Sequence, residues 1–77
     1  MTAVYLTRVD TGKNMARFYA VSLQPTLFGE WSLVREWGRI GRGGQVKATV
    51  YPARVEAEQA LQKLQSAKVR KGYRGTL

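Results

Sequence analysis

The period of the hydrophobic residues changes once in this chain of 77 residues, at Pro52, and that change constrains the fold more than any other feature. Before Pro52, apolar and β-branched residues alternate with polar ones, which is the pattern of half-buried strands. After it, apolar residues recur at spacings of three and four, as on one face of a helix: Ala57, Ala60, Leu61, Leu64 and Ala67. That face needs a covering surface, and the strands supply one. The sequence therefore predicts an α+β fold, a small antiparallel sheet of about four strands with one C-terminal helix packed on one face.

Turn-forming segments divide the first part of the chain into four expected strands. The segments 10–14, 24–29 and 41–44 are rich in Gly, Pro, Asp or Asn, which favour turns and interrupt strand pairing. Strands are therefore expected over residues 4–9, 15–23, about 30–40 and 45–51. In the second strand, one face carries Arg17, Tyr19, Val21 and Leu23, and the other carries Phe18, Ala20 and Ser22.

The expected helix has a clearer end than start. Pro52 suits its first turn, but no Ser, Thr, Asp or Asn stands at the expected cap position. Glu56 and Glu58 lie near the start and basic residues crowd the last turn, which complements the helix dipole at both ends. Gly72 can close the helix, because glycine adopts the left-handed conformation in which many helices end.

The composition excludes most catalytic chemistry. The chain has neither Cys nor His, which rules out disulfides, thiolate or imidazole metal sites, and Cys/His or Ser/His nucleophiles. Its acidic residues lack the paired spacing of acid–base catalysis or of a magnesium site. We therefore expect no enzyme activity, no cofactor, no metal and no small-molecule substrate. The length predicts a single domain over residues 1–77.

The sequence carries no membrane or export signal. No apolar run approaches the roughly 20 residues that a membrane span needs. The first five residues lack the basic and then apolar layout of a signal peptide. These observations predict a cytoplasmic protein, and its charge is compatible with association with the nucleoid.

The net charge is the most informative bulk property. The chain has 13 Lys and Arg against 5 Asp and Glu, which gives a formal charge of +8 at pH 7. Such an excess raises the local concentration of polyanions, so nucleic acid is the favoured partner, with DNA ahead of RNA. Two alternatives stay open: a charge that serves solubility alone, and a module that docks an acidic protein partner. A membrane surface is disfavoured, because the helix carries mainly Ala and Leu opposite its charges.

The segment 36–45 combines features that suit contact with a phosphate and its sugar. It places Trp37 two residues before Arg39 and contains four glycines within ten positions. Flat apolar surface, charged donors and a backbone that a ligand can approach closely thus occur together. The alternative is structural, with Trp37 in the core and Arg39 as an ordinary solvated arginine.

Trp37-Gly38-Arg39 followed by Ile40-Gly41 resembles the signature of the WGR domain family, found in several poly(ADP-ribose) polymerases and in small bacterial proteins. The resemblance extends over about residues 14–74 and includes Phe18, Tyr19, Trp31, Lys68, Gly72 and Tyr73. It implies a curved antiparallel sheet with a helix and a signature loop that engages DNA near a strand end. The roles that it carries over are sugar packing by Trp37, and DNA and interdomain contact by Arg39. The polymerase and zinc-finger domains have no counterpart in these 77 residues, so nucleic-acid binding is the role that can persist alone.

The predicted function is therefore a nucleic-acid-binding module, with strand ends or nicks among its targets. Residues in mid-strand are expected to pack in the core: Trp31, Phe18, Leu33 and Val34. The candidate binding residues are the signature, nearby cations and the basic helix end: Trp37, Gly38, Arg39, Arg42, Lys47, Arg17, Tyr19, Lys68, Arg70, Lys71 and Tyr73.

Overall fold

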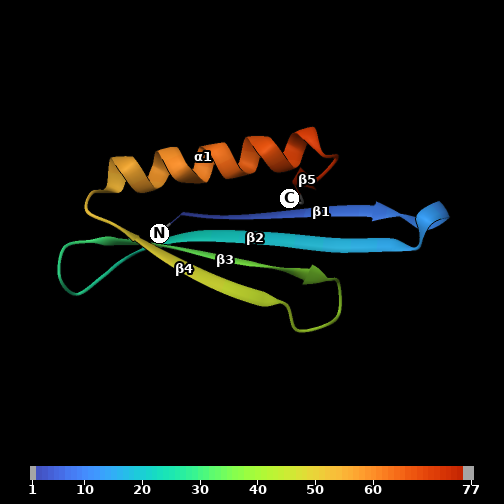
Figure 1. The fold of residues 1–77 in the computed structure, drawn as a ribbon, viewed down its shortest axis with the longest axis horizontal. Coiled ribbons are helices and arrows are strands. Elements are labelled where there is room, and N and C mark those ends of the chain that lie inside the picture. The colour runs from blue at the N-terminus through green and yellow to red at the C-terminus, as the bar shows by residue number, and fades with distance from the viewer. Residues whose placement is uncertain (1, 76–77) are drawn as a thin grey trace.

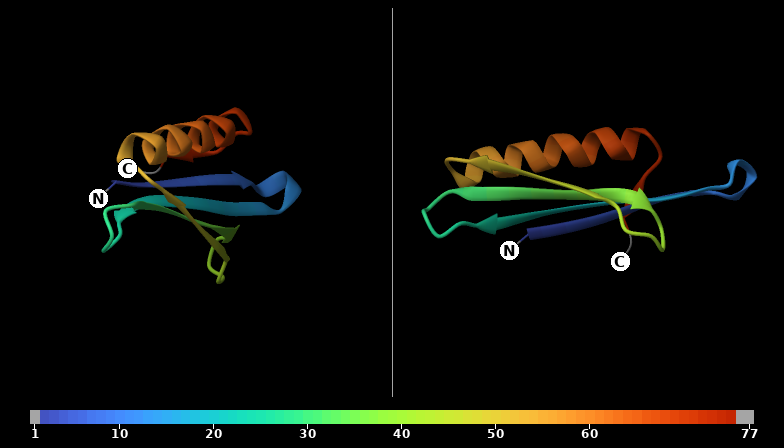
Figure 2. Two further views of the ribbon diagram at one scale, coloured as in Figure 1. Left: turned by 60° about the vertical axis from the view of Figure 1, so that its left-hand side comes forward. Right: turned by 60° about the horizontal axis from the view of Figure 1, so that its bottom comes forward.

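The structure, a computed structural model, describes residues 2–75. Its elements follow one another as β1 (Thr2–Asp10), the 3-10 turn η1 (Thr11–Lys13), β2 (Met15–Pro25), β3 (Trp31–Arg39), β4 (Gln45–Tyr51), α1 (Arg54–Arg70) and β5 (Arg74–Gly75). The strands form one open antiparallel sheet in the order β4-β3-β2-β1-β5, and α1 lies across one face (Figure 1). The sheet is curved and twisted beneath the helix (Figure 2). The predicted α+β fold is confirmed, and β5 is a short fifth strand that pairs with β1.

The core lies between α1 and the sheet. Strand pairing keeps the predicted alternation, because Tyr19, Val21 and Leu23 of β2 are buried on the helix side. Leu33 of β3, at 1% exposed, faces them on the neighbouring strand. The whole buried cluster is Leu6, Tyr19, Val21, Leu23, Leu33, Ala57, Leu61 and Tyr73. Three strands, the helix and Tyr73 after the helix therefore share one hydrophobic layer.

The helix differs from the prediction in where it begins and in the last residue of its buried stripe. It begins at Arg54, so Pro52 lies before the first turn, and its N-cap Ala53 makes no side-chain hydrogen bond. Ala67 is exposed, while Lys68 continues the buried stripe seven residues after Leu61. No helix within residues 2–75 is long and apolar enough to cross a membrane.

The helix ends at Arg70 and is closed by Gly72, as predicted. Gly72 has φ +97°, and its N–H donates to Val69 O at 3.0 Å. The N–H of Tyr73 donates to Lys68 O, also at 3.0 Å. This pair of bonds is the Schellman closure, in which a left-handed residue turns the chain back over the last helical turn. It carries the Tyr73 ring into the core beside the helix end.

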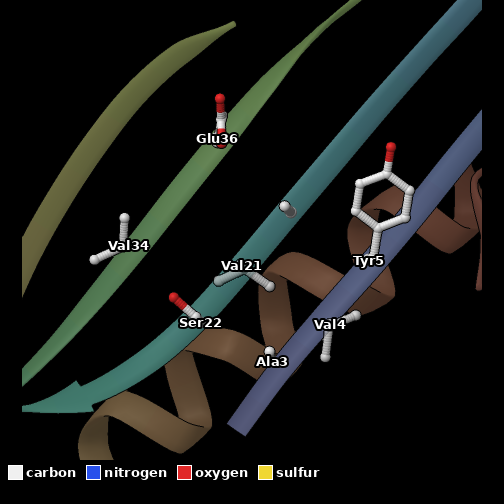
Figure 3. A pocket seen from close by; sticks show the side chains of 8 residues that line it. Ala3, Val4, Tyr5, Val21, Ser22, Val34 and Glu36 are labelled. Carbon is white, nitrogen blue, oxygen red and sulfur yellow. The ribbon is translucent and has the colours of Figure 1, made fainter. Parts of the chain in front are cut away.

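The sheet face away from α1 is open and mostly apolar. Tyr5, Ser22, Val34 and Glu36 point from three strands toward a shallow hollow of about 250 Å³ on this face (Figure 3). Glu36 is the one charged residue among those that line it. A hollow with a single carboxylate does not suit a polyanion.

Two of the four residues expected in mid-strand core positions lie on the helix side of the sheet, and two do not. Leu33 is in the core, and half-buried Trp31 opens β3 beneath the Arg54 guanidinium, 5.1 Å from the ring centroid. Val34 lies half-buried on the open face. Phe18 is buried at 8% exposure, but on that same open side, where its ring stacks on Tyr5 with centroids 6.0 Å apart.

Two glycines make the burial of Phe18 possible. A Cβ on Gly44 would lie 2.3 Å from Trp37 O and 2.9 Å from the Phe18 ring. A Cβ on Gly38 would lie 3.0 Å from the Gly44 backbone. Gly38, the glycine of the Trp-Gly-Arg signature, therefore leaves room for the Gly44 backbone to pack closely against Phe18.

This packing predicts that a methyl group added at Gly44 destabilises the protein, whereas one added at the neighbouring Gly43 has little effect. Gly44→Ala should lower the free energy of unfolding by about 1–3 kcal/mol, because the new methyl group meets backbone that cannot yield. Gly43→Ala is the matched control, since its Cβ would have no atom within 4 Å, and should change stability by about 0.5 kcal/mol or less. Urea denaturation followed by tryptophan fluorescence measures both, and equal stabilities of the two variants would contradict the close packing.

Candidate nucleic-acid interface

The signature residues meet in a cleft at the C-terminal end of the helix. The cleft has a volume of about 500 Å³ and receives side chains from β2, β3, α1 and the segment that follows α1. Its lining residues are Arg17, Phe18, Trp37, Gly38, Arg39, Lys68 and Tyr73. Most of the residues predicted from the sequence are therefore brought together, and none of the lining residues is acidic.

Strand register places two arginines opposite each other at the mouth of this cleft. Arg17 of β2 pairs directly with Arg39 of β3, and the next pair on the same face is Tyr19 with Trp37. Like charges directly opposite one another destabilise a sheet. The repulsion would be relieved by an anion between the two guanidinium groups.

Arg39 is held by the turn between β1 and β2. Its Nη1 donates to Asn14 O at 3.1 Å and its Nη2 donates to Asn14 Oδ1 at 3.4 Å. Asn14 adopts the left-handed conformation, φ 50°, that ends η1. A guanidinium has five N–H donors, so Arg39 is oriented by two and presents the others on an exposed side chain. Arg39 is therefore an exposed arginine whose guanidinium is anchored on one side by Asn14.

Lys68 lies between two aromatic rings. Its Nζ is 4.9 Å from the centroid of the Tyr19 ring and 5.3 Å from that of the Tyr73 ring, within the range of cation–π contacts. The Schellman closure sets this geometry, because Tyr73 follows the left-handed Gly72 and folds back on Lys68. Partial burial lowers the pKa of Lys68 below its ordinary value of 10.5, and the charges of Lys71, Arg35 and Arg17 lower it further.

Tyr19 supports the cleft from below instead of lining it. Its side chain is 2% exposed, and its hydroxyl is buried with no hydrogen-bond partner among the described residues. The direct phosphate contact expected from the sequence does not fit this burial. Its ring instead forms the surface on which the Lys68 ammonium rests.

Trp37 stands half-buried between the cleft and Arg35. The Arg35 guanidinium carbon lies 5.5 Å from the centroid of the indole ring. Arg35 precedes Trp37 by two residues, so both side chains lie on the helix side of β3. The alternation of β3 is the signal that could have identified Arg35, which the sequence prediction missed.

The remaining predicted residues surround the cleft without lining it. Arg42 is exposed in the turn after β3, where its N–H donates to Arg39 O at 3.1 Å and Gly41 has φ +87°. Lys47 is exposed on β4, directly opposite Arg35. Arg70 and Lys71 are exposed at the end of α1. These four cations extend the positive surface beyond the signature.

Comparison with known proteins identifies relatives of this chain. The chain is 41% identical over 71 residues to the uncharacterized protein y4dW of Sinorhizobium fredii, and the match covers 92% of this chain and 35% of that protein. A crystal structure of a Bacteroides fragilis protein superposes with a TM-score of 0.82 at 25% identity, covering 99% of this chain and 20% of the other. The chain thus spans about a third or less of the length of these two relatives. The model of the WGR domain matches residues 2–76, and the chain therefore belongs to the WGR domain family.

Proposed function

We propose that the protein is a DNA-binding module that holds DNA in the cleft of Arg17, Trp37, Arg39, Lys68 and Tyr73. The observation that carries this proposal is the convergence of three cations with Trp37 and Tyr73 on one cleft whose lining includes no acidic residue. The WGR family is associated with nucleic-acid binding in polymerases that form poly(ADP-ribose), which supports the same function. The module binds without catalysing a reaction.

Each side chain has a definite task in this proposal. The free N–H groups of Arg39 donate to paired phosphate oxygens, which suits the planar fork of an arginine. Arg17 and Lys68 neutralise neighbouring phosphates. Trp37 and Tyr73 offer flat apolar surface to a sugar or base, and the family resemblance directs Trp37 to the sugar at a strand end.

The four glutamates lie away from the cleft, while the one aspartate, Asp10, ends β1 at the turn and accepts a hydrogen bond from Gly12 N–H at 3.1 Å. Glu30 lies in the turn between β2 and β3, at the other end of β3 from Trp37. Glu36 is on the open sheet face, while Glu56 and Glu58 lie near the start of α1. An acidic nucleic acid in the cleft therefore approaches cations without meeting the charges of these four glutamates.

We expect DNA binding to weaken steeply with salt. Neutralising roughly 3–5 phosphates gives a slope of log K against log salt of about −3 to −4.5, from about −0.9 for each phosphate of B-DNA. Fluorescence anisotropy on a labelled duplex with a 5′-phosphate, at several salt concentrations, measures the slope. A slope near zero, or no binding at low salt, would sink the proposal in favour of an acidic protein partner.

Arg39 should act by geometry as well as charge. Arg39→Lys keeps the net charge at +8 but removes the paired donors and both bonds to Asn14. We expect it to weaken DNA binding by about 1 kcal/mol or more, the scale of a charge-assisted hydrogen bond. Arg74→Lys, an equal exchange at an exposed position outside the cleft, is the control and should bind as the parent does. If Arg39→Lys also binds like the parent while Arg39→Ala is weaker, Arg39 contributes charge alone.

Binding should also depend on pH through Lys68. Burial and three neighbouring cations lower its pKa in the free protein, and a phosphate in the cleft favours its charged form, so DNA should raise that pKa. Binding then takes up a proton, and affinity should fall as pH rises toward 10.5, the ordinary lysine value. NMR titration of the Lys68 Cε signal with and without DNA measures the shift. An unchanged or lower pKa in the complex would remove Lys68 from the interface.

A further inference from the structure

A second cationic region continues from the cleft along the other side of Trp37. A groove of about 270 Å³ runs between α1 and strands β3 and β4. Its lining residues are Leu33, Arg35, Thr49, Tyr51, Ala60, Lys63 and Leu64. The floor is therefore largely apolar, and cations stand at its edge.

Among the described residues, the cations in and beside this groove form no ion pair with a carboxylate. Arg35 and Lys47 are direct cross-strand partners on the same face, an arrangement that repels. Lys63 lines the groove from the helix side. The ion pair within residues 2–75 joins Arg54 and Glu58 at the start of the helix, and it includes none of these cations. Such uncompensated charge indicates that the region meets an anion.

Arg35 joins the groove to the cleft. Its guanidinium lies over the Trp37 ring, which lines the cleft, and the same side chain lines the groove. Tyr51, at the opposite end, pairs with Trp31, six residues before Trp37. At about 3.3 Å per residue, these positions are roughly 20 Å apart. The path thus has room for a few extended nucleotides.

We propose that an unpaired single-stranded extension of the DNA held in the cleft runs along this groove. Its phosphates lie against Arg35, Lys47 and Lys63, and its bases rest on the apolar floor, with the Tyr51 ring as a stacking surface. A duplex does not fit these contacts, because its base faces are stacked inside and it presents only phosphate, sugar and base edges. The inference rests on the proposed DNA binding in the cleft and adds the class of DNA: a duplex end with an unpaired extension.

The test compares three labelled duplexes that share one double-stranded sequence. One is blunt, one has a four-nucleotide 3′ extension and one has a four-nucleotide 5′ extension. We expect the parent protein to bind one of the extended duplexes about fivefold more tightly than the blunt one, or better, since stacking a base on an aromatic ring contributes at least that much. The measured quantity is the ratio of extended to blunt affinity, determined by anisotropy at one salt concentration.

Variants assign this gain to the groove. Lys47→Gln combined with Lys63→Gln should reduce the ratio to about one, and Tyr51→Leu should lower it while keeping apolar bulk. Lys13→Gln combined with Arg74→Gln removes the same amount of charge at exposed positions that do not line the groove, and should preserve the ratio. Circular dichroism shows whether each variant is folded.

The outcomes separate this inference from the function on which it rests. If the blunt duplex binds with the expected salt dependence but neither extension increases affinity, the groove proposal is wrong and the cleft proposal stands. A gain that survives Lys47→Gln with Lys63→Gln would also overturn it, as would an acidic peptide that binds the groove when neither extension does. If no duplex binds, both proposals fail together.

Discussion

The packing of α1 on the centre of the sheet is the contact on which the rest of the molecule depends. Ala57 is fully buried, and its small side chain lets the helix backbone approach β2 and β3 closely. Leu61, one turn later, belongs to the same buried cluster between the helix and the sheet. Because a helix repeats its face every seven residues, the same stripe carries Lys68 above the end of the sheet. The position of the cationic cleft is therefore a consequence of how the core is packed.

The cleft and groove carry repulsion that the fold does not relieve internally. Arg17 faces Arg39, and Arg35 faces Lys47, each pair across two neighbouring strands. Lys68 adds a fifth cation, partly desolvated on two tyrosine rings. These like-charge contacts lower the stability of the free protein. A polyanion bound between the cations would replace their mutual repulsion by attraction to the ligand. Functional sites of natural proteins often lower the stability of the fold in this way.

Much of the fold could be predicted from periodicity, because alternation and the helical stripe each report directly on one buried face. The family signature likewise identified Trp37 and Arg39 by local sequence. What periodicity could not show was which residues meet across elements: Lys63 became recognisable only once helix docking placed it at one groove with Arg35. The two-residue β5 is too short to leave a pattern. The sequence pattern places Ala67 and not Lys68 in the apolar stripe. The reason is that a lysine partly buried over aromatic rings cannot be distinguished from a surface lysine by sequence alone.

The closure of α1 by Gly72 has a consequence for how the protein is made. Tyr73 reaches the cleft only through that closure, while Arg17 enters the same cleft from near the other end of the chain. A nascent chain leaving the ribosome has β1 to β4 long before it has Lys68 and Tyr73. Its sheet can pair early, but the cleft is complete only when synthesis has passed Tyr73. The cleft therefore forms only after Tyr73 has been synthesised, and nascent chains that stop short of it would lack it.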